Sequence, residues 1–177
     1  RARIEDRVTV PRATNTAGAG RTAGVANTAG AGRTGGVANA PGAAHSQFVD
    51  IEGAGRPVTI EYKWIARERR NAPLAVFLHE GLGSLSMWRD WPQAVCDPVG
   101  MRGLVYSREG YGRSTPRPHL EDWPPSFMHD QAQAALPALL AALDVDPAND
   151  PPWLIGHSDG GSIALIHAAL FPGSVAG

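Results

Sequence analysis

Residues 153–162, Trp153-Leu154-Ile155-Gly156-His157-Ser158-Asp159-Gly160-Gly161-Ser162, decide the fold of this chain. A short apolar run ends at Gly156, and an apolar, helix-compatible run from Ser162 to Phe171 begins just after Gly161. A strand that turns sharply into a helix holds its turning residue in a strained conformation and leaves little room for side chains on the neighbours. The Gly-x-Ser-x-Gly motif between the two runs therefore predicts such a turn. It would expose the Ser158 hydroxyl at the C-terminal edge of a sheet, beside the first N–H groups of a helix.

The motif allows two interpretations, a catalytic serine or an idle serine in a glycine-rich turn. Short motifs arise by chance in a chain that has 21 glycines. The strand before the motif, the helix after it and a matching loop upstream favour the catalytic interpretation. We therefore expect Ser158 to be a nucleophile and Gly156 and Gly160 to be the glycines of the turn. We expect Gly161 to be equally intolerant of a Cβ.

Length, charge and cysteine content exclude several classes of protein. The 177 residues suit one domain with additional material, and the net charge of −1 gives no electrostatic case for nucleic acid as a partner. The single cysteine, Cys96, excludes an intrachain disulfide and a cysteine-based metal site. The sequence shows neither a secretory leader nor an apolar run of membrane-spanning length. We expect a cytoplasmic protein that acts on a small molecule without cofactor or metal and without membrane contact.

Residues 1–46 differ in composition from the rest of the chain. Asn15–Ala26 and Asn27–Ala38 form a tandem repeat of twelve residues, which differs only at Ala23 and Gly35. Such a Gly- and Ala-rich segment buries too little apolar surface to offset the entropy of ordering it. The sequence thus predicts a disordered tail over 1–46 and a folded domain over 47–177.

The remaining pattern predicts an α/β fold. Residues 48–51 suggest a short strand, and residues 58–64 alternate between apolar and polar, as in a half-buried antiparallel strand. Three continuous apolar runs, 74–78, 103–106 and 153–155, are typical of strands buried on both faces. A weak helical segment, 88–96, lies between the first two runs, and a strong one, 127–143, lies between the last two. Pro137 should kink the strong segment. This alternation favours a mainly parallel sheet with flanking helices and ligands at the C-terminal ends of the strands.

The loop after the first apolar run, His79-Glu80-Gly81-Leu82, matches the requirements of an oxyanion hole. A serine that attacks an acyl carbon creates an oxyanion, which needs N–H donors fixed in advance. One donor should be the backbone of Asp159, and the other that of Gly81, with Leu82 as the alternative. We expect His79 to hold this loop by hydrogen bonding and not to act as the general base.

Three glycine motifs together resemble the α/β-hydrolase fold superfamily. They are His79-x-Gly81-x-Gly83, Gly110-x-Gly112-x-Ser114 and Gly156-x-Ser158-x-Gly160-Gly161. The resemblance covers residues 48–177, although the start His79-Glu80 departs from the commoner His-Gly. It implies an open, mainly parallel sheet with helices on both faces, Ser158 as nucleophile, and Gly81 and Asp159 as oxyanion donors. The Gly110-x-Gly112 turn lacks the three-glycine spacing of a dinucleotide site and is expected to be architectural.

In the same family, dehalogenases and epoxide hydrolases carry an aspartate nucleophile. Ser158 instead favours esters, thioesters, lactones, amides or activated C–C bonds as substrates. The family order places the triad acid and then the His after the nucleophile, yet the segment after Ser158 contains His167 and no Asp or Glu. His167 should lie on a helix face, His157 should point away, and His119 and His129 precede the serine.

We therefore expect this chain to be the N-terminal portion of a serine hydrolase, truncated after the nucleophile helix and inactive alone. A non-catalytic binding or scaffold protein on the same fold is the alternative. Trp88, Trp123, Phe127 and Met128 either line an acyl pocket or pack in the core or on the surface, and packing is favoured.

Overall fold

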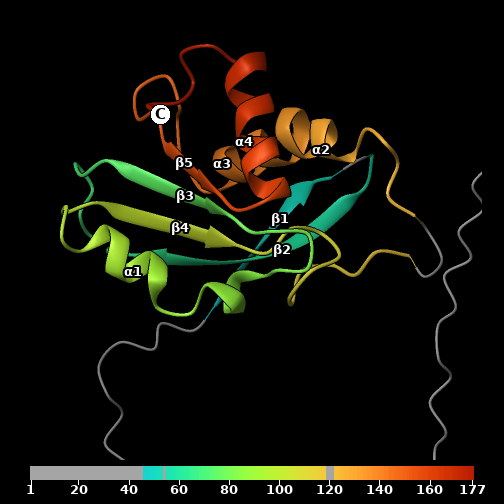
Figure 1. Cartoon of the computed structure of the whole chain (residues 1–177), viewed down its shortest axis with the longest axis horizontal. Coiled ribbons are helices and arrows are strands. Elements are labelled where there is room, and N and C mark those ends of the chain that lie inside the picture. Colours follow the sequence, from blue (N-terminus) through green and yellow to red (C-terminus); the bar gives the residue numbers. More distant parts are fainter. Residues whose placement is uncertain (1–45, 54, 119–121) are drawn as a thin grey trace, which may run out of the picture. The chain divides into compact units, whose positions relative to one another are not determined.

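The computed structural model describes residues 46–53, 55–118 and 122–177. The elements are β1 (Gln47–Glu52), β2 (Pro57–Ile65), β3 (Leu74–Leu78), the 3-10 helix η1 (Leu85–Trp88), α1 (Trp91–Cys96), β4 (Arg102–Tyr106), α2 (Phe127–Asp130), the π-helix η2 (Gln131–Ala135), α3 (Leu136–Ala142), β5 (Trp153–Gly156) and α4 (Asp159–Leu170) (Figure 1). Every expected strand is present close to its predicted position. The expected disordered tail, except for Ser46, lies outside the described residues.

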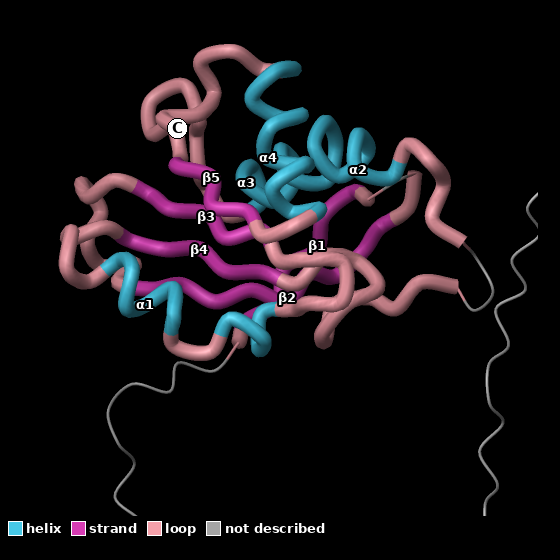
Figure 2. The backbone as a smooth tube through the Cα atoms, viewed as in Figure 1, coloured by secondary structure: helices cyan, strands magenta, loops and turns pink. Residues whose placement is uncertain are grey.

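The five strands form one mixed sheet in the order β1-β2-β4-β3-β5. β3 pairs in parallel with β4 and β5, whereas β2 pairs antiparallel with β1 and β4. Figure 2 shows the strands of this sheet in magenta. The expectation of a mainly parallel sheet was therefore wrong. A tight turn, in which Gly53 N–H donates to Arg56 O at 2.8 Å, joins β1 to β2, and so short a connection can only make an antiparallel pair.

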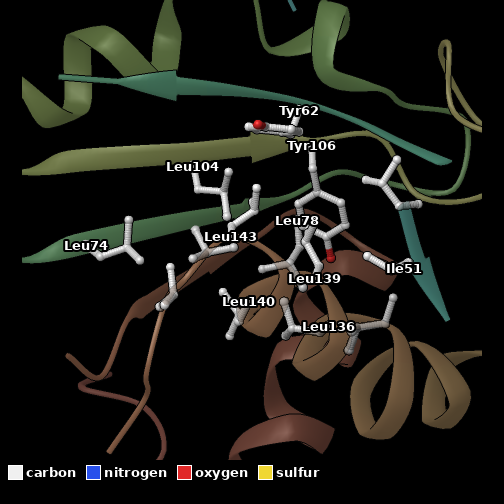
Figure 3. Close-up of a cluster of buried hydrophobic side chains, with 14 of the residues drawn as sticks. Ile51, Tyr62, Leu74, Leu78, Leu104, Tyr106, Leu136, Leu139, Leu140 and Leu143 are labelled. Atoms are coloured by element: carbon white, nitrogen blue, oxygen red, sulfur yellow. The ribbon is translucent and has the colours of Figure 1, made fainter. Parts of the chain in front are cut away.

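The sheet separates two apolar cores, and β3 contributes to both. Leu74, Val76 and Leu78 face the larger core, and Ala75 and Phe77 face the smaller one. α1 covers the smaller core, while α2, α3 and α4 lie on the opposite face (Figure 1). Figure 3 shows leucines of α3 meeting β3 and β4 in the larger core. Because helices cover both faces, all five residues of β3 are completely buried, as its continuous apolar sequence predicts.

The segment from Phe127 to Ala142 is helical throughout, but it is not one regular α-helix. η2 interrupts it, with Leu136 N–H donating to Gln131 O, five residues back. This wide turn immediately precedes Pro137, which has no N–H and whose ring crowds the preceding turn of an α-helix. The irregularity expected at Pro137 thus takes the form of a π-helical stretch.

The two crossovers that leave parallel strands run to opposite sides of β3. The connection through α1 leads from β3 to β4, and the one through α2 and α3 leads from β4 to β5 on the other side of β3. In open α/β sheets, this reversal of direction creates a crevice at the C-terminal ends of the strands. The loops after β3, β4 and β5 all begin at this edge.

The last residues of the chain lie along the outer edge of β5. Ala176 N–H donates to Pro152 O and Leu154 N–H donates to Gly177 O, each at 2.9 Å. Within the described ranges, no helix has the length and apolar character needed to cross a membrane.

Candidate active site

The turn between β5 and α4 has the geometry expected of a nucleophile elbow. Ser158 adopts φ 54° and ψ −121°, a conformation that residues with a side chain rarely occupy. Gly161 N–H donates to Ser158 O at 2.9 Å and Ser162 N–H donates to the same oxygen at 3.2 Å, so the helix begins directly at the serine. The Ser158 side chain is exposed and makes no capping hydrogen bond. Its hydroxyl is therefore free to meet a substrate.

Two of the three glycines around Ser158 are sterically required. A Cβ on Gly160 would overlap the carbonyl oxygens of Leu78 and His79, and one on Gly156 would overlap the backbone of Gly160 and Gly161. Gly161 differs, because a Cβ there would lie 3.4 Å from Gly156 O, an ordinary contact. The expectation that Gly161 cannot accept a side chain was wrong.

The loop after β3 lies against the residue that follows the serine. A Cβ on Gly81 would lie 3.2 Å from Asp159 Oδ2, so Gly81 and Asp159 are neighbours in space. In the described part of the chain, the backbone N–H groups of Gly81, Leu82 and Asp159 donate no hydrogen bond. Free amides on adjacent backbones are what an oxyanion hole requires. The geometry brings both predicted donor residues together and leaves the choice between Gly81 and Leu82 open.

His79 is a buried, neutral residue that holds the loop together. Its Nδ1 donates to Glu80 O at 2.6 Å, and its Nε2 accepts from the Arg108 backbone N–H at 3.0 Å. Burial, and then the nearby Arg108 guanidinium, lower the pKa of His79 from 6.5 to about 4. Both ring nitrogens are occupied by backbone groups, which agrees with the expected hydrogen-bonding role.

We expect His79 to make the protein less stable on acidification. The unfolded residue titrates near pKa 6.5 and the folded one near 4, so the unfolded state binds more protons between these values. The free energy of unfolding therefore falls as the pH falls through this range, by on the order of 3 kcal/mol. Urea denaturation at pH 7 and pH 4.5 should show a larger drop for wild type than for His79→Gln. Equal drops would contradict this account.

The loop after β4 is held by polar residues that sequence analysis missed. Glu61 on β2 is buried and accepts hydrogen bonds from Ser107 Oγ at 3.0 Å and from Arg113 N–H at 2.9 Å. Tyr111, between the glycines of the Gly110-x-Gly112 turn, packs on His79, with ring centroids 5.0 Å apart. This arrangement agrees with the architectural role expected for the turn.

Arg108, which directly follows Ser107, is a further residue that sequence analysis missed. Its side chain is 1% exposed, and its Nη2 lies 3.1 Å from Asp159 Oδ2 and 3.0 Å from Glu80 O. The only sequence signal is its position, because charged residues directly after a buried strand lie at the edge where ligands bind.

Among the described residues, His167 is not available as a base for Ser158. His167 is 2% exposed and bonded on both ring nitrogens, to Ala132 O at 2.7 Å and to Ser174 Oγ at 3.3 Å. His119 lies outside the described residues. Across residues 46–53, 55–118 and 122–177, no hydrogen bond joins Ser158 Oγ to a histidine, and no cluster of three His, Cys, Asp or Glu could hold a metal.

Two of the four candidate pocket residues pack into the cores. The Trp88 ring meets the buried Phe77 ring edge-on at 5.6 Å, and Met128 packs against the larger core. Trp123 lies between Tyr111 and Phe127, with ring centroids 6.3 and 5.1 Å away.

Residues 73–177 match the family described as alpha/beta hydrolase fold. No curated protein sequence matches the chain. A probable hydrolytic enzyme from Pseudomonas aeruginosa is similar in structure, with 24% identity, a TM-score of 0.61, and coverage of 75% of this chain and 39% of that one. A laboratory-evolved variant of potato epoxide hydrolase is similar with 20% identity, a TM-score of 0.59, and coverage of 74% and 37%.

A mutant epoxide hydrolase from Bacillus megaterium is also similar, with 18% identity, a TM-score of 0.56, and coverage of 73% of this chain and 39% of that one. At these identities the likeness concerns the fold. The chain spans only 37–39% of the length of these three structures. Because the family match covers more than half of the sequence and agrees with the sheet, the elbow and the loops described above, the chain belongs to the α/β-hydrolase fold family.

Proposed function

We propose that this chain is the nucleophile-bearing part of a serine hydrolase. Its substrate would be a small molecule with an ester, thioester, lactone or activated C–C bond. The observation that carries the proposal is the conformation of Ser158, with φ 54° directly before Asp159, which lies beside Gly81; the N–H groups of both residues donate no hydrogen bond among the described residues. A strained residue with an exposed hydroxyl at this edge of the sheet supports a catalytic role.

In the proposed reaction, Ser158 Oγ forms a bond to the carbonyl carbon, and the π electrons of the carbonyl move to its oxygen. The hydroxyl proton passes to an imidazole base, and the oxyanion accepts hydrogen bonds from Asp159 N–H and from Gly81 or Leu82 N–H. Collapse of the intermediate expels the leaving group, which takes the proton from the imidazolium. Water then attacks the acyl-enzyme by the same route and releases the acid.

The imidazole base and its orienting carboxylate are proposed to come from sequence that follows Gly177 in a longer form of the protein. Two observations support this division. His79 and His167 already use both ring nitrogens in hydrogen bonds, and this chain spans only 37–39% of the length of its structural neighbours. A serine hydroxyl without its base is a poor nucleophile near neutral pH, so we propose that residues 1–177 alone are inactive.

Epoxide hydrolases are among the structural neighbours, but the residue at the elbow supports different chemistry. A carboxylate nucleophile forms an ester with an alkyl carbon, whereas the Ser158 hydroxyl is suited to attack an acyl carbon. We therefore propose acyl transfer to water for this chain.

A fluorophosphonate probe tests the proposal, because it reacts covalently with an activated serine. We expect a longer form that includes sequence after Gly177 to be labelled and to hydrolyse a short-chain aryl ester. Residues 1–177 should be at least a thousand-fold less active than the longer form, because only residual catalysis remains when members of the triad are missing.

Equal labelling of both forms would show that a histidine within this chain completes the site. No labelling or turnover by the longer form would favour the alternative, a non-catalytic binding or scaffold protein on the same fold.

A further inference from the structure

Arg108 connects the two loops that carry the proposed oxyanion donors. It directly follows Ser107 after β4, and one of its nitrogens, Nη2, donates to both loops. One bond of 3.0 Å reaches Glu80 O, in the loop after β3, and the other of 3.1 Å reaches Asp159 Oδ2, at the start of α4. A single guanidinium group thus bridges two segments that are far apart in the sequence.

Each partner of Arg108 lies at or next to a proposed donor. Glu80 O belongs to the peptide whose nitrogen is Gly81 N, so the bond to that oxygen orients the Gly81 amide directly. Asp159 is itself the other donor residue, and its Oδ1 also accepts from Gly160 N–H at 3.1 Å. Fixing the Asp159 side chain therefore restrains the first peptides of α4.

The burial of Arg108 makes these contacts obligatory. Its side chain is 1% exposed, and its Nε and Nη1 have no hydrogen-bond partner among the described residues. A buried cation is tolerated when a carboxylate compensates it, and here Asp159, with its side chain 11% exposed, is that carboxylate. The neutral His79, at 3.4 Å from Nη2, and the Tyr111 ring, at 5.2 Å from the guanidinium carbon, complete the packing.

We propose that Arg108 is a positioning residue, which holds the backbone N–H groups of Gly81 and Asp159 at the spacing that the oxyanion needs. This inference rests on the proposed function. Arg108 acts through Glu80 and Asp159 and does not touch the substrate. Arg108 should stabilise the transition state more than the bound substrate, because the hydrogen bonds that it organises strengthen as charge develops on the substrate oxygen.

Kinetics of the longer, catalytically complete form test this assignment. Arg108→Met should lower kcat for a short-chain aryl ester about a hundred-fold, the effect of a misplaced site, with KM little changed. The substitution should also weaken the binding of an aryl trifluoromethyl ketone, which forms an oxyanion with serine. It should weaken the binding of the matched methyl ketone far less. Arg108→Lys should restore part of both effects, since it retains the charge.

Arg69→Met is the matched control, because Arg69 pairs with Asp97 at the same 3.1 Å but on the exposed surface. Arg69→Met should leave kcat and the ratio of the two ketone affinities unchanged. If Arg108→Met reduced the melting temperature without changing the ratio of the two ketone affinities, Arg108 would be a structural residue only and the proposal would be overturned.

Amide hydrogen exchange on residues 1–177 separates this inference from the proposed function. Arg108→Met should speed exchange at Gly83 and Gly160, whose N–H groups donate to Glu80 O and Asp159 Oδ1, at least ten-fold relative to the amides of β2, whereas Arg69→Met should not. Unchanged exchange at both sites would refute the positioning role whatever the activity. If Ser158→Ala leaves the ester hydrolysis of the longer form intact, the proposed function fails independently.

Discussion

Replacing Ser158 by Ala in a longer, active form should abolish fluorophosphonate labelling and reduce ester turnover at least a thousand-fold. The substitution removes the attacking oxygen and leaves the elbow, the glycines and the amides of Gly81 and Asp159 in place. Only catalysis by binding and by the oxyanion hole would remain, which is what loss of a nucleophile leaves in serine hydrolases. Initial rates and in-gel fluorescence of the two proteins measure the effect.

Ser162→Ala is the matched control for this substitution. Ser162 is also exposed and lies on the first turn of α4, but its backbone conformation is helical. We expect the control to be labelled and active like wild type. Labelling that survives Ser158→Ala would show that the nucleophile lies elsewhere.

Replacing Gly160 by Val should destabilise the fold by several kcal/mol, the range for side chains forced into an occupied backbone position. A Cβ on Gly160 would overlap Leu78 O and His79 O, where α4 packs against the end of β3. The helix can only make room by moving away from the strand, which disrupts the elbow as well. Thermal and urea denaturation of residues 1–177 give the loss directly.

Gly161→Ala provides the comparison within the same helix. Its Cβ would make an ordinary contact at 3.4 Å, and alanine is the better helix former by about 1 kcal/mol. We therefore expect the Gly161→Ala protein to be as stable as wild type or slightly more stable. An unchanged melting temperature for Gly160→Val would mean that α4 does not approach β3 as closely as described.

The positions of the strands and of the elbow could be predicted because their determinants are local. Residues 74–78 are all apolar and form a strand with a helical layer on each side and a parallel partner on each edge. The elbow needs glycines at fixed positions beside a serine, and Gly156 and Gly160 fulfil a steric requirement that sequence spacing reveals.

The mixed pairing of the sheet and the polar network depend on contacts between distant residues. No local pattern shows that β2 pairs with β4, that Glu61 accepts from Ser107, or that Arg108 reaches Asp159. The π-helical stretch before Pro137 likewise depends on how the long helix fits the core. The sequence does not distinguish a buried charged residue after a strand from a solvated one, because the difference lies in the residue that it contacts in the folded protein.

The position of β5 in the sheet has a consequence for the order in which the protein forms during synthesis. β1 and β2 are joined by a short hairpin, and β3 and β4 by a brief crossover, so four strands can associate soon after Tyr106 leaves the ribosome. β5 must return to β3, where Trp153 pairs with Ala75, and this contact closes a much longer loop at a higher entropic cost. We therefore expect the strained backbone of Ser158 to form last, against strands that are already paired, so that their contacts offset the cost of its unfavourable conformation.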